Sequence, residues 1–360
     1  MIFLILLVLL LILVPWRRQA ADGSILYMSR HHTNLINGFF IFVVFFRHFC
    51  SREPQMNSLD MWYVEWEGQL LCQLLVSTFF FFSGFGIQSS LLKKGREYAW
   101  ALITKRFCGL LMSFGLMVLL YLGIQLLHGE RYSLGHVVLS LLAWKSVGNP
   151  SWFIFMTLAE YLIVAFCWLL FARWGRHVVV MVVIMVTAVW LFVVGSCKPF
   201  WYVNTLLCVP FGMLFALHKD RMLQIQQRMG SFVLFVVPVL FFVGGYVHVN
   251  GYNMTSLPVL NYWVGSLISN VGAGVFALGW ALVAGWLSLV VPSLSRPAMF
   301  LAFCGGPALF YIYMLHGIPL QQGERMGLAA YGELYLVLSL LATVLLVCGA
   351  FLIKQKLCKK

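Results

Sequence analysis

The chain has 360 residues, of which 62% are hydrophobic and only 10% are charged. An ordinary soluble domain carries about 25% charged residues, so this composition excludes one and indicates a polytopic membrane protein. The net charge of +13 does not indicate a nucleic-acid partner, because the cations occupy short connections between apolar runs and form no soluble basic face.

Residues 1–16 form an apolar segment that Arg17 and Arg18 follow directly. A cleaved signal peptide normally carries its charge before the apolar core and small residues at the cleavage site. Because the order here is reversed, we favour an extra membrane span, with the N-terminus outside, over a signal peptide. Residues 1–32 are then an N-terminal apolar segment and a basic cytoplasmic linker.

Ten further runs have the roughly 17 to 25 apolar residues that a helix needs to cross ~30 Å of hydrocarbon. They predict an all-α transmembrane helix bundle over residues 33–353. Segment 134–147 is too short to span and precedes Gly148-Asn149-Pro150, so we expect an amphipathic helix along the outer interface. The ten core spans are predicted at 33–50, 69–92, 107–127, 152–172, 177–196, 200–217, 231–249, 264–290, 299–320 and 332–353.

The orientation follows from the excess of Lys and Arg in cytoplasmic loops. With residues 17–32 and the basic tail 354–360 inside, 18 of the 24 cations fall in cytoplasmic segments. An even number of core spans agrees with both core ends being inside. The six cations at or beyond the outer ends are Arg47, Arg52, Arg131, Lys145, Lys198 and Arg325.

The first core span carries a polar stripe that ends in His48. A charged group at membrane depth costs at least ~2.5 kcal/mol, so it is retained where a function or a partner requires it. At 100° per residue, Arg30, Asn37 and His48 share one helix face, with Asn34 nearby. The stripe must face protein or water, because lipid offers no hydrogen-bond partners. With residue 33 inside, His48 lies ~20 Å up the span, in the outer half of the bilayer.

The second core span has a similar stripe. Its members fall within roughly 100° of one another and are Gln69, Gln73, Ser77, Gly84 and Gln88. Two polar stripes on successive helices suggest a shared wet cavity. The alternative is simple attachment of one helix to another through amides and small residues, which is common in membrane bundles.

Other spans contribute isolated polar residues. Arg106 begins the third span and could turn inward to pair with phosphate or to polarise an acyl carbonyl. Tyr313 and His316 share a face of the ninth span at i, i+3. Glu160 is an intramembrane carboxylate for which Arg47 and Arg106 are candidate partners. The nine cysteines show no Cys-x-x-Cys spacing, so neither a disulfide framework nor a metal site is indicated.

Several sequence blocks occur together in a characteristic order. They are Asn37-x10-His48, Phe79-Phe-Phe-Phe-Ser83-Gly84-Phe85-Gly86 with its trailing Lys93-Lys94-Gly95, Lys105-Arg106, Ser151-Trp152-Phe153 and, more weakly, Leu309 to Pro319. In order and approximate spacing they resemble the acyltransferase-3 family of bacterial integral membrane acyltransferases, which O-acylate cell-surface and secreted glycans among other acceptors. Ten spans with both core ends inside agree with that family.

The chain departs from the family pattern at two places. Family members commonly carry Arg or Lys where this chain has Asn37, so the cation is supplied by Arg30, by Arg47 or by nothing equivalent. The third-span motif often continues with a second arginine, where this chain has Cys108-Gly109.

The resemblance implies a division of roles. His48 would act as general base on an acceptor hydroxyl or relay the acyl group, since a neutral imidazole suits proton transfer near pH 7. Arg106, with Lys105 and Arg30, would bind the phosphates of an acyl-CoA at the cytoplasmic mouth. The passage between them would be lined by Asn37, Ser83, Gly84, Trp152, Tyr313 and His316.

The resemblance also implies the partners and the location of the protein. The co-substrate would be acyl-CoA, by default acetyl-CoA, with no bound cofactor, and the acceptor would be a hydroxyl of a cell-envelope or exported glycan. The protein would lie in the bacterial cytoplasmic membrane with its C-terminus in the cytoplasm.

Two other functions fit a helix bundle with a polar cavity. One is a transporter or flippase of a small molecule or lipid-linked glycan, although transporters often show inverted repeats, which we do not find here. The other is a structural subunit of a glycan-export assembly, against which the His48 stripe argues mildly.

Overall fold

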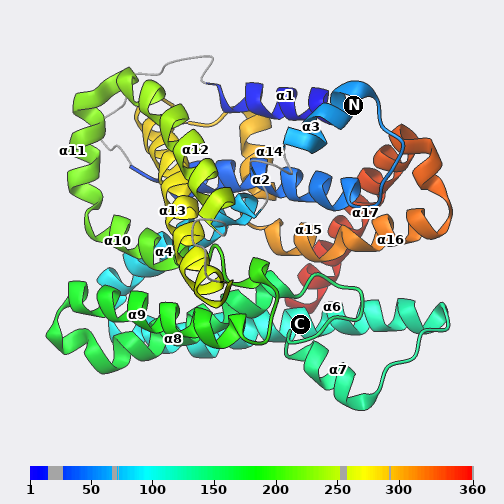
Figure 1. The fold of residues 1–360 in the computed structure, drawn as a ribbon, viewed down its shortest axis with the longest axis horizontal. Coiled ribbons are helices and arrows are strands. Elements are labelled where there is room, and N and C mark those ends of the chain that lie inside the picture. Colours follow the sequence, from blue (N-terminus) through cyan, green and yellow to red (C-terminus); the bar gives the residue numbers. More distant parts are fainter. Residues whose placement is uncertain (15–26, 67–70, 72, 252–257, 292, 359–360) are drawn as a thin grey trace.

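The computed structural model describes the chain except for residues 15–26, 67–70, 72, 252–257, 292 and 359–360 (Figure 1). The described residues form helices and no strands, which confirms the predicted all-α bundle. The α-helices are α1 Ile2–Leu13, α2 Arg30–Cys50, α3 Ser58–Trp66, α4 Leu74–Lys94, α5 Arg96–Ala101, α6 Cys108–Leu127, α7 Leu134–Leu141, α8 Trp152–Phe171, α9 Arg176–Gly195, α10 Cys208–Leu217, α11 Lys219–Met229, α12 Val233–Asn250, α13 Pro258–Val290, α14 Arg296–Cys304, α15 Leu309–Leu315, α16 Gly317–Arg325 and α17 Gly332–Cys358.

Among the described residues, eight helical stretches are long and apolar enough to cross a membrane. The predicted span 299–320 is a bent pair instead, because Arg296–Cys304 and Leu309–Arg325 meet at 62°. Counting this pair as one span gives nine. The predicted span 200–217 is not a continuous helix, since a 3-10 turn at Phe200–Tyr202 precedes the ten-residue α10.

The N-terminal segment is shorter than expected. Its described part is the 12-residue helix α1, about 18 Å long at 1.5 Å per residue, which is too short to cross the hydrocarbon core alone. Pro15 and Trp16 lie outside the described residues. Figure 1 shows α1 alongside α2, and Ile2, Leu6 and Leu9 are buried. Over the described residues, the possible eleventh span is thus represented by this short helix alone, and the full-length span stays a prediction.

The segment predicted at 134–147 forms the short helix α7 over its first half. Ser133 begins the helix, and its side-chain oxygen accepts a hydrogen bond from the His136 backbone N–H at 3.2 Å. This is the N-cap arrangement that satisfies a helix's free backbone donors. Leu134 and Val138 remain exposed on the molecular surface.

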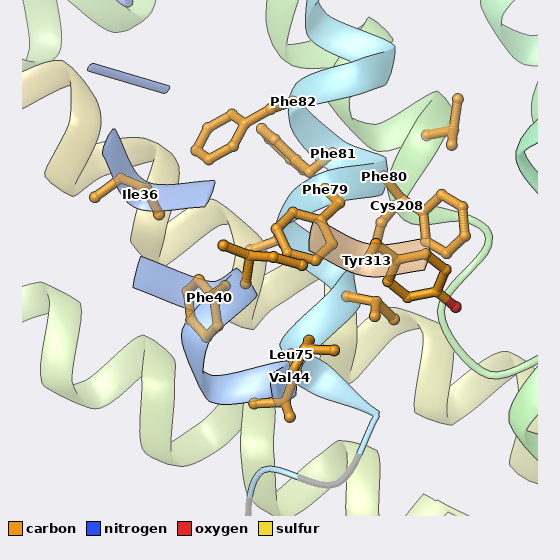
Figure 2. Packing of buried hydrophobic residues seen from close by; sticks show 14 of the residues in the cluster. Ile36, Phe40, Val44, Leu75, Phe79, Phe80, Phe81, Phe82, Cys208 and Tyr313 are labelled. Atoms are coloured by element: carbon orange, nitrogen blue, oxygen red, sulfur yellow. The ribbon is translucent and has the colours of Figure 1, made fainter. Parts of the chain in front are cut away.

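The helices α2 and α4 are the most deeply buried spans of the bundle. Apolar side chains form their contact, and Figure 2 shows Phe40 and Val44 of α2 close to Leu75 and Phe79 of α4. A buried aromatic ring removes a large apolar area from its surroundings and packs in few orientations. The contact fixes the relative position of the two helices that carry the polar stripes.

Gly84 of α4 marks a close approach of two backbones. A Cβ atom added there would lie 1.9 Å from the carbonyl oxygen of Val209 in α10. No side-chain rotation can relieve that clash, because both atoms belong to backbone or are fixed directly to it. The glycine therefore allows α4 and α10 to touch.

We expect Gly84→Ala to reduce the yield of folded protein, since overpacking typically costs about 1–3 kcal/mol. The measurement is the amount of monodisperse protein extracted in mild detergent, together with its thermal unfolding midpoint. Gly86→Ala on the same helix is the matched control, because a Cβ there has no neighbour within 4 Å. Equal yields and midpoints for the two variants would contradict the assigned contact.

Candidate functional site

One face of α2 lines three successive cavities. Arg30 and Asn37 face the first, Ile41 faces the second, and Val44 and His48 face the third. Successive positions in this series are three, four or seven residues apart, and such spacings place side chains on a single face of a helix. The stripe predicted from the sequence is therefore a real surface, and Arg30 and His48 lie about 27 Å apart along it.

The outer cavity encloses about 550 Å³ at the C-terminal end of α2. It contains His48, and Trp152 from the start of α8 and Tyr313 from α15 form part of its wall, as the sequence predicted. Arg47 also faces it, from the position next to His48. A titratable imidazole and a cation thus share a space bounded largely by aromatic rings.

The inner cavity encloses about 420 Å³ at the opposite end of α2. Arg30 and Arg106 both line it, together with Asn37 and Ser83. The Asn37 side-chain oxygen is buried and has no hydrogen-bond partner among the described residues. Two guanidinium groups that line one cavity suit a phosphate-bearing ligand. Arg30 thus brings a cation into the cavity that Asn37 lines.

A middle cavity of about 180 Å³ shares wall residues with each of these two spaces. Ser83 and Leu309 line both the inner and the middle cavity, and Tyr313 lines both the middle and the outer one. Most of its other walls are apolar, including Phe79 and Phe80, which Figure 2 shows beside Tyr313. The three spaces therefore lie one after another along α2, with neighbouring spaces bordered by common residues.

His48 has a second imidazole beside it. The ring centroids of His48 and His316 lie 4.9 Å apart, with the planes tilted by 52°. His316 is buried, and its Nδ1 lies 2.9 Å from the carbonyl oxygen of Ile312. Because a carbonyl only accepts, this contact requires Nδ1–H and leaves Nε2 as the acceptor of a neutral His316 ring. His316, predicted to line the passage, is not among the residues that line the three cavities and lies beside His48 instead.

Arg106 lies on an unusual stretch of helix. Residues Leu102–Phe107 are π-helical, between α5 and α6. Such stretches are rare and frequently occur at functional sites. Leu102 and Arg106, at the two ends of one turn, both line the inner cavity. Lys105 is exposed and is not among the residues that line the three cavities, and its predicted contact with the donor stays a prediction.

The polar stripe of α4 packs mainly against protein. Ser77 and Gln88 are fully buried, and Gly84 contacts the Val209 backbone and not a cavity. Helix attachment, the alternative left open by the sequence, explains Gly84, and the predicted lining role of Gly84 is wrong. The Ser77 hydroxyl donates to the Leu74 carbonyl of its own helix, and both amide atoms of Gln88 are buried without a hydrogen-bond partner among the described residues. Gln73 does face the outer cavity, whereas Gln69 lies outside the described residues.

Glu160 is paired differently from the expectation. The hydroxyl of Thr187 in α9 donates to its Oε1 at 3.0 Å, and neither Arg47 nor Arg106 forms an ion pair with it among the described contacts. The carboxyl group therefore joins α8 to α9 within the bundle and stands apart from the three cavities.

Sequence reasoning missed two residues of the outer cavity, His248 and Asn204. His248 ends the apolar span α12, just as His48 ends α2, so its position at membrane depth was a usable signal. Asn204 lies in the irregular segment before α10, where no helical period exists to indicate its direction.

Comparison with protein families gives one assignment. A family model for an acyltransferase domain, that of the acyltransferase-3 family, matches residues 30–354. The chain belongs to this family. The match begins at the first residue of α2 and ends within α17, so it includes every residue that lines the three cavities except Met28. Comparisons with curated proteins and with solved structures gave no match.

Family membership makes this chain a multi-pass membrane acyltransferase. An acyltransferase needs a place for the donor, a place for the acceptor and a path on which the acyl carbon meets the acceptor atom. The acyltransferase chain has cations at one end of its three cavities and an imidazole at the other.

Proposed function

We propose that the protein transfers an acyl group, by default acetyl, from cytoplasmic acyl-CoA to a hydroxyl of a cell-envelope or exported glycan. The observation that supports this is the series of cavities along α2, with Arg30 and Arg106 at one end and His48 at the other. The location is the bacterial cytoplasmic membrane, with the inner cavity and the C-terminus on the cytoplasmic side, as the distribution of Lys and Arg favours.

In this proposal the inner cavity holds the phosphates of the donor. Arg30 and Arg106 approach from α2 and from the π-helical turn, so their guanidinium groups can contact phosphate from two sides. Charge-assisted hydrogen bonds from Arg to phosphate are about twice as strong as neutral ones. Asn37 offers its unpaired side-chain oxygen to an N–H or O–H of the donor.

The middle cavity accepts the narrow acyl-bearing arm of the donor. Its largely apolar walls suit an uncharged chain and exclude the phosphates, which remain at the arginines. The thioester carbonyl is then delivered towards His48 while the nucleotide end stays at the cytoplasmic mouth. Holding both reactants in this way makes the transfer effectively unimolecular.

His48 acts as general base in the transfer step. The acceptor hydroxyl gives its proton to the neutral imidazole while the hydroxyl oxygen attacks the thioester carbonyl carbon. The carbon–sulfur bond then breaks, and the imidazolium returns the proton to the departing thiolate. The products are an O-acyl ester and free CoA. The His316 ring lies beside the His48 ring, and Arg47 faces the same cavity as His48.

Acyl transfer is tested in everted membrane vesicles, whose cytoplasmic face is outward. With labelled acetyl-CoA added outside, we expect alkali-labile label in the envelope glycan only when the chain is present. Mass spectrometry of surface glycans from cells with and without the chain provides the matching measurement in vivo.

A transporter or flippase is the second candidate, and the bend between α14 and α15 favours it, since broken helices are common in transporters. The two candidates predict different defects in cells that lack the chain. Loss of glycan export with intact esterification supports transport, whereas loss of the ester with intact export supports the acyltransferase.

A further inference from the structure

His248 and Asn204 contribute polar side chains to the lining of the outer cavity. Both side chains line the cavity, yet only 3% of His248 and 4% of Asn204 are exposed. Neither residue belongs to the α2 stripe or to the His48–His316 pair. Buried polar groups are normally hydrogen-bonded, so the partners of these two residues indicate what this part of the lining can bind.

The orientation of His248 is fixed by α13. Its Nδ1 lies 2.9 Å from the carbonyl oxygen of Ser269, and the Ser269 hydroxyl donates in return to the His248 carbonyl at 2.7 Å. The carbonyl can only accept, so Nδ1 carries the hydrogen and Nε2 of the neutral ring carries a lone pair. Nε2 forms no hydrogen bond within the described part of the chain.

The two helices are held close enough to make this contact rigid. A Cβ added at Gly272 of α13 would lie 2.4 Å from the His248 backbone nitrogen, so α12 and α13 touch at this point. Such close packing of small residues is a usual way for membrane helices to associate. His248 is therefore presented to the cavity by a fixed backbone as well as by a fixed tautomer.

Asn204 is presented by the same helix. Asn270 of α13 accepts from the Leu207 N–H at 2.8 Å and donates to the Val203 carbonyl at 2.6 Å, and Ser266 donates to that carbonyl at 3.1 Å. These contacts fix the segment that carries Asn204. The Asn204 side-chain oxygen is buried and has no hydrogen-bond partner among the described residues.

We propose that His248 and Asn204 form the acceptor-binding wall of the outer cavity and hydrogen-bond two hydroxyl groups of one polyol, a sugar ring. This inference rests on the proposed acyl transfer and names the residues that hold its acceptor. Nε2 of His248 and the amide oxygen of Asn204 both accept hydrogen bonds, so the ligand must present two hydrogen-bond donors. Trp152 and Trp201 line the same space and offer apolar faces to the C–H side of such a ring.

The charge of the cavity discriminates among ligands that carry hydrogen-bond donors. Ammonium groups also donate hydrogen bonds, but the described lining of the cavity contains no carboxylate that would attract a cation. A neutral or anionic polyol needs no such carboxylate. With one hydroxyl at His48 and two others at His248 and Asn204, the wall determines which hydroxyl reaches the base.

Two substitutions at His248 separate binding from structure. In His248→Asn, the side-chain amide can still donate to the Ser269 carbonyl from near the Nδ1 position, but no atom replaces Nε2. In His248→Gln, the longer amide reaches the Nε2 position. Asn204→Leu keeps the volume of Asn204 and removes its acceptor. The probe is envelope glycan of the host, treated with alkali to free its hydroxyls and labelled with tritium.

We expect His248→Asn and Asn204→Leu each to weaken glycan binding and raise the acceptor KM by about 10- to 100-fold, as for a lost buried hydrogen bond. His248→Gln is expected to retain more binding than His248→Asn. The KM for acetyl-CoA should remain at the wild-type value in all three, because the donor enters from the inner cavity.

Equilibrium binding of the labelled glycan without donor distinguishes this inference from the proposed reaction. Glycan binding that depends on His248 and Asn204, without transfer in the wild type, supports the acceptor wall and rejects the acyl transfer. Unchanged binding and acceptor KM in folded His248→Asn and Asn204→Leu overturn the wall even when transfer is intact. A fall in yield for all three variants, with unchanged affinity in the folded fraction, also overturns it.

Discussion

Membranes that carry His48→Ala are expected to contain normal amounts of the protein and to form almost no ester on the envelope glycan. General-base catalysis by a positioned side chain typically contributes ~10² to 10⁴-fold, so transfer should fall by about that factor. The fold should survive, because His48 borders the outer cavity and is only partly buried. The measurement is the rate of alkali-labile acetyl incorporation at a fixed amount of extracted protein.

A matched control for this variant is His177→Ala. His177 is exposed on α9 and lies in none of the three cavities, so its replacement should leave the transfer rate unchanged. Binding of labelled acetyl-CoA should be unaffected in both variants, since the inner cavity is intact. Full ester formation by His48→Ala would remove His48 from the reaction.

The α2 face could be predicted from the sequence because it depends on local geometry alone. A helix places residues three or four apart on one side, and lipid cannot satisfy polar groups there, so Arg30, Asn37 and His48 had to face inward. The structure places all three on cavities. The prediction needed only the helical period and the cost of a polar group in hydrocarbon.

The α4 stripe shows the limit of the same reasoning. Period and polarity indicate that Ser77, Gly84 and Gln88 share a face, but they do not say whether water or another helix covers it. The answer depends on α10, whose Val209 carbonyl occupies the space beside Gly84. Contacts between helices far apart in the sequence are not encoded in either helix's own pattern.

The same limit applies to the outer cavity. The direction of the Asn204 side chain depends on Asn270 and Ser266 of α13, which fix its segment. The direction of the His248 ring depends on Ser269, which fixes that ring. The residues of α13 that make these contacts lie about twenty to seventy residues further along the sequence. Residues that position others are therefore found from the structure, whereas residues at membrane depth can be found from the sequence.

Filling the middle cavity should uncouple donor binding from transfer. Thr157 of α8 lines this cavity and neither of the others, and its hydroxyl donates to the Phe153 carbonyl at 2.7 Å. We expect Thr157→Phe to place a ring in the roughly 180 Å³ through which the acyl arm must pass. Because a misplacement of about 1 Å can cost 10²-fold, the transfer rate should fall by at least about that factor.

Acetyl-CoA binding measured at equilibrium should change little in Thr157→Phe, because Arg30 and Arg106 are not displaced. Thr157→Val is the matched control, since it removes the hydroxyl and its hydrogen bond but leaves the cavity open. A slow Val variant would assign the effect to that hydrogen bond. If Thr157→Phe transfers the acyl group at the wild-type rate, the acyl group reaches His48 by a route outside the middle cavity. If Thr157→Phe binds the donor but transfers no acyl group, the route runs through the middle cavity.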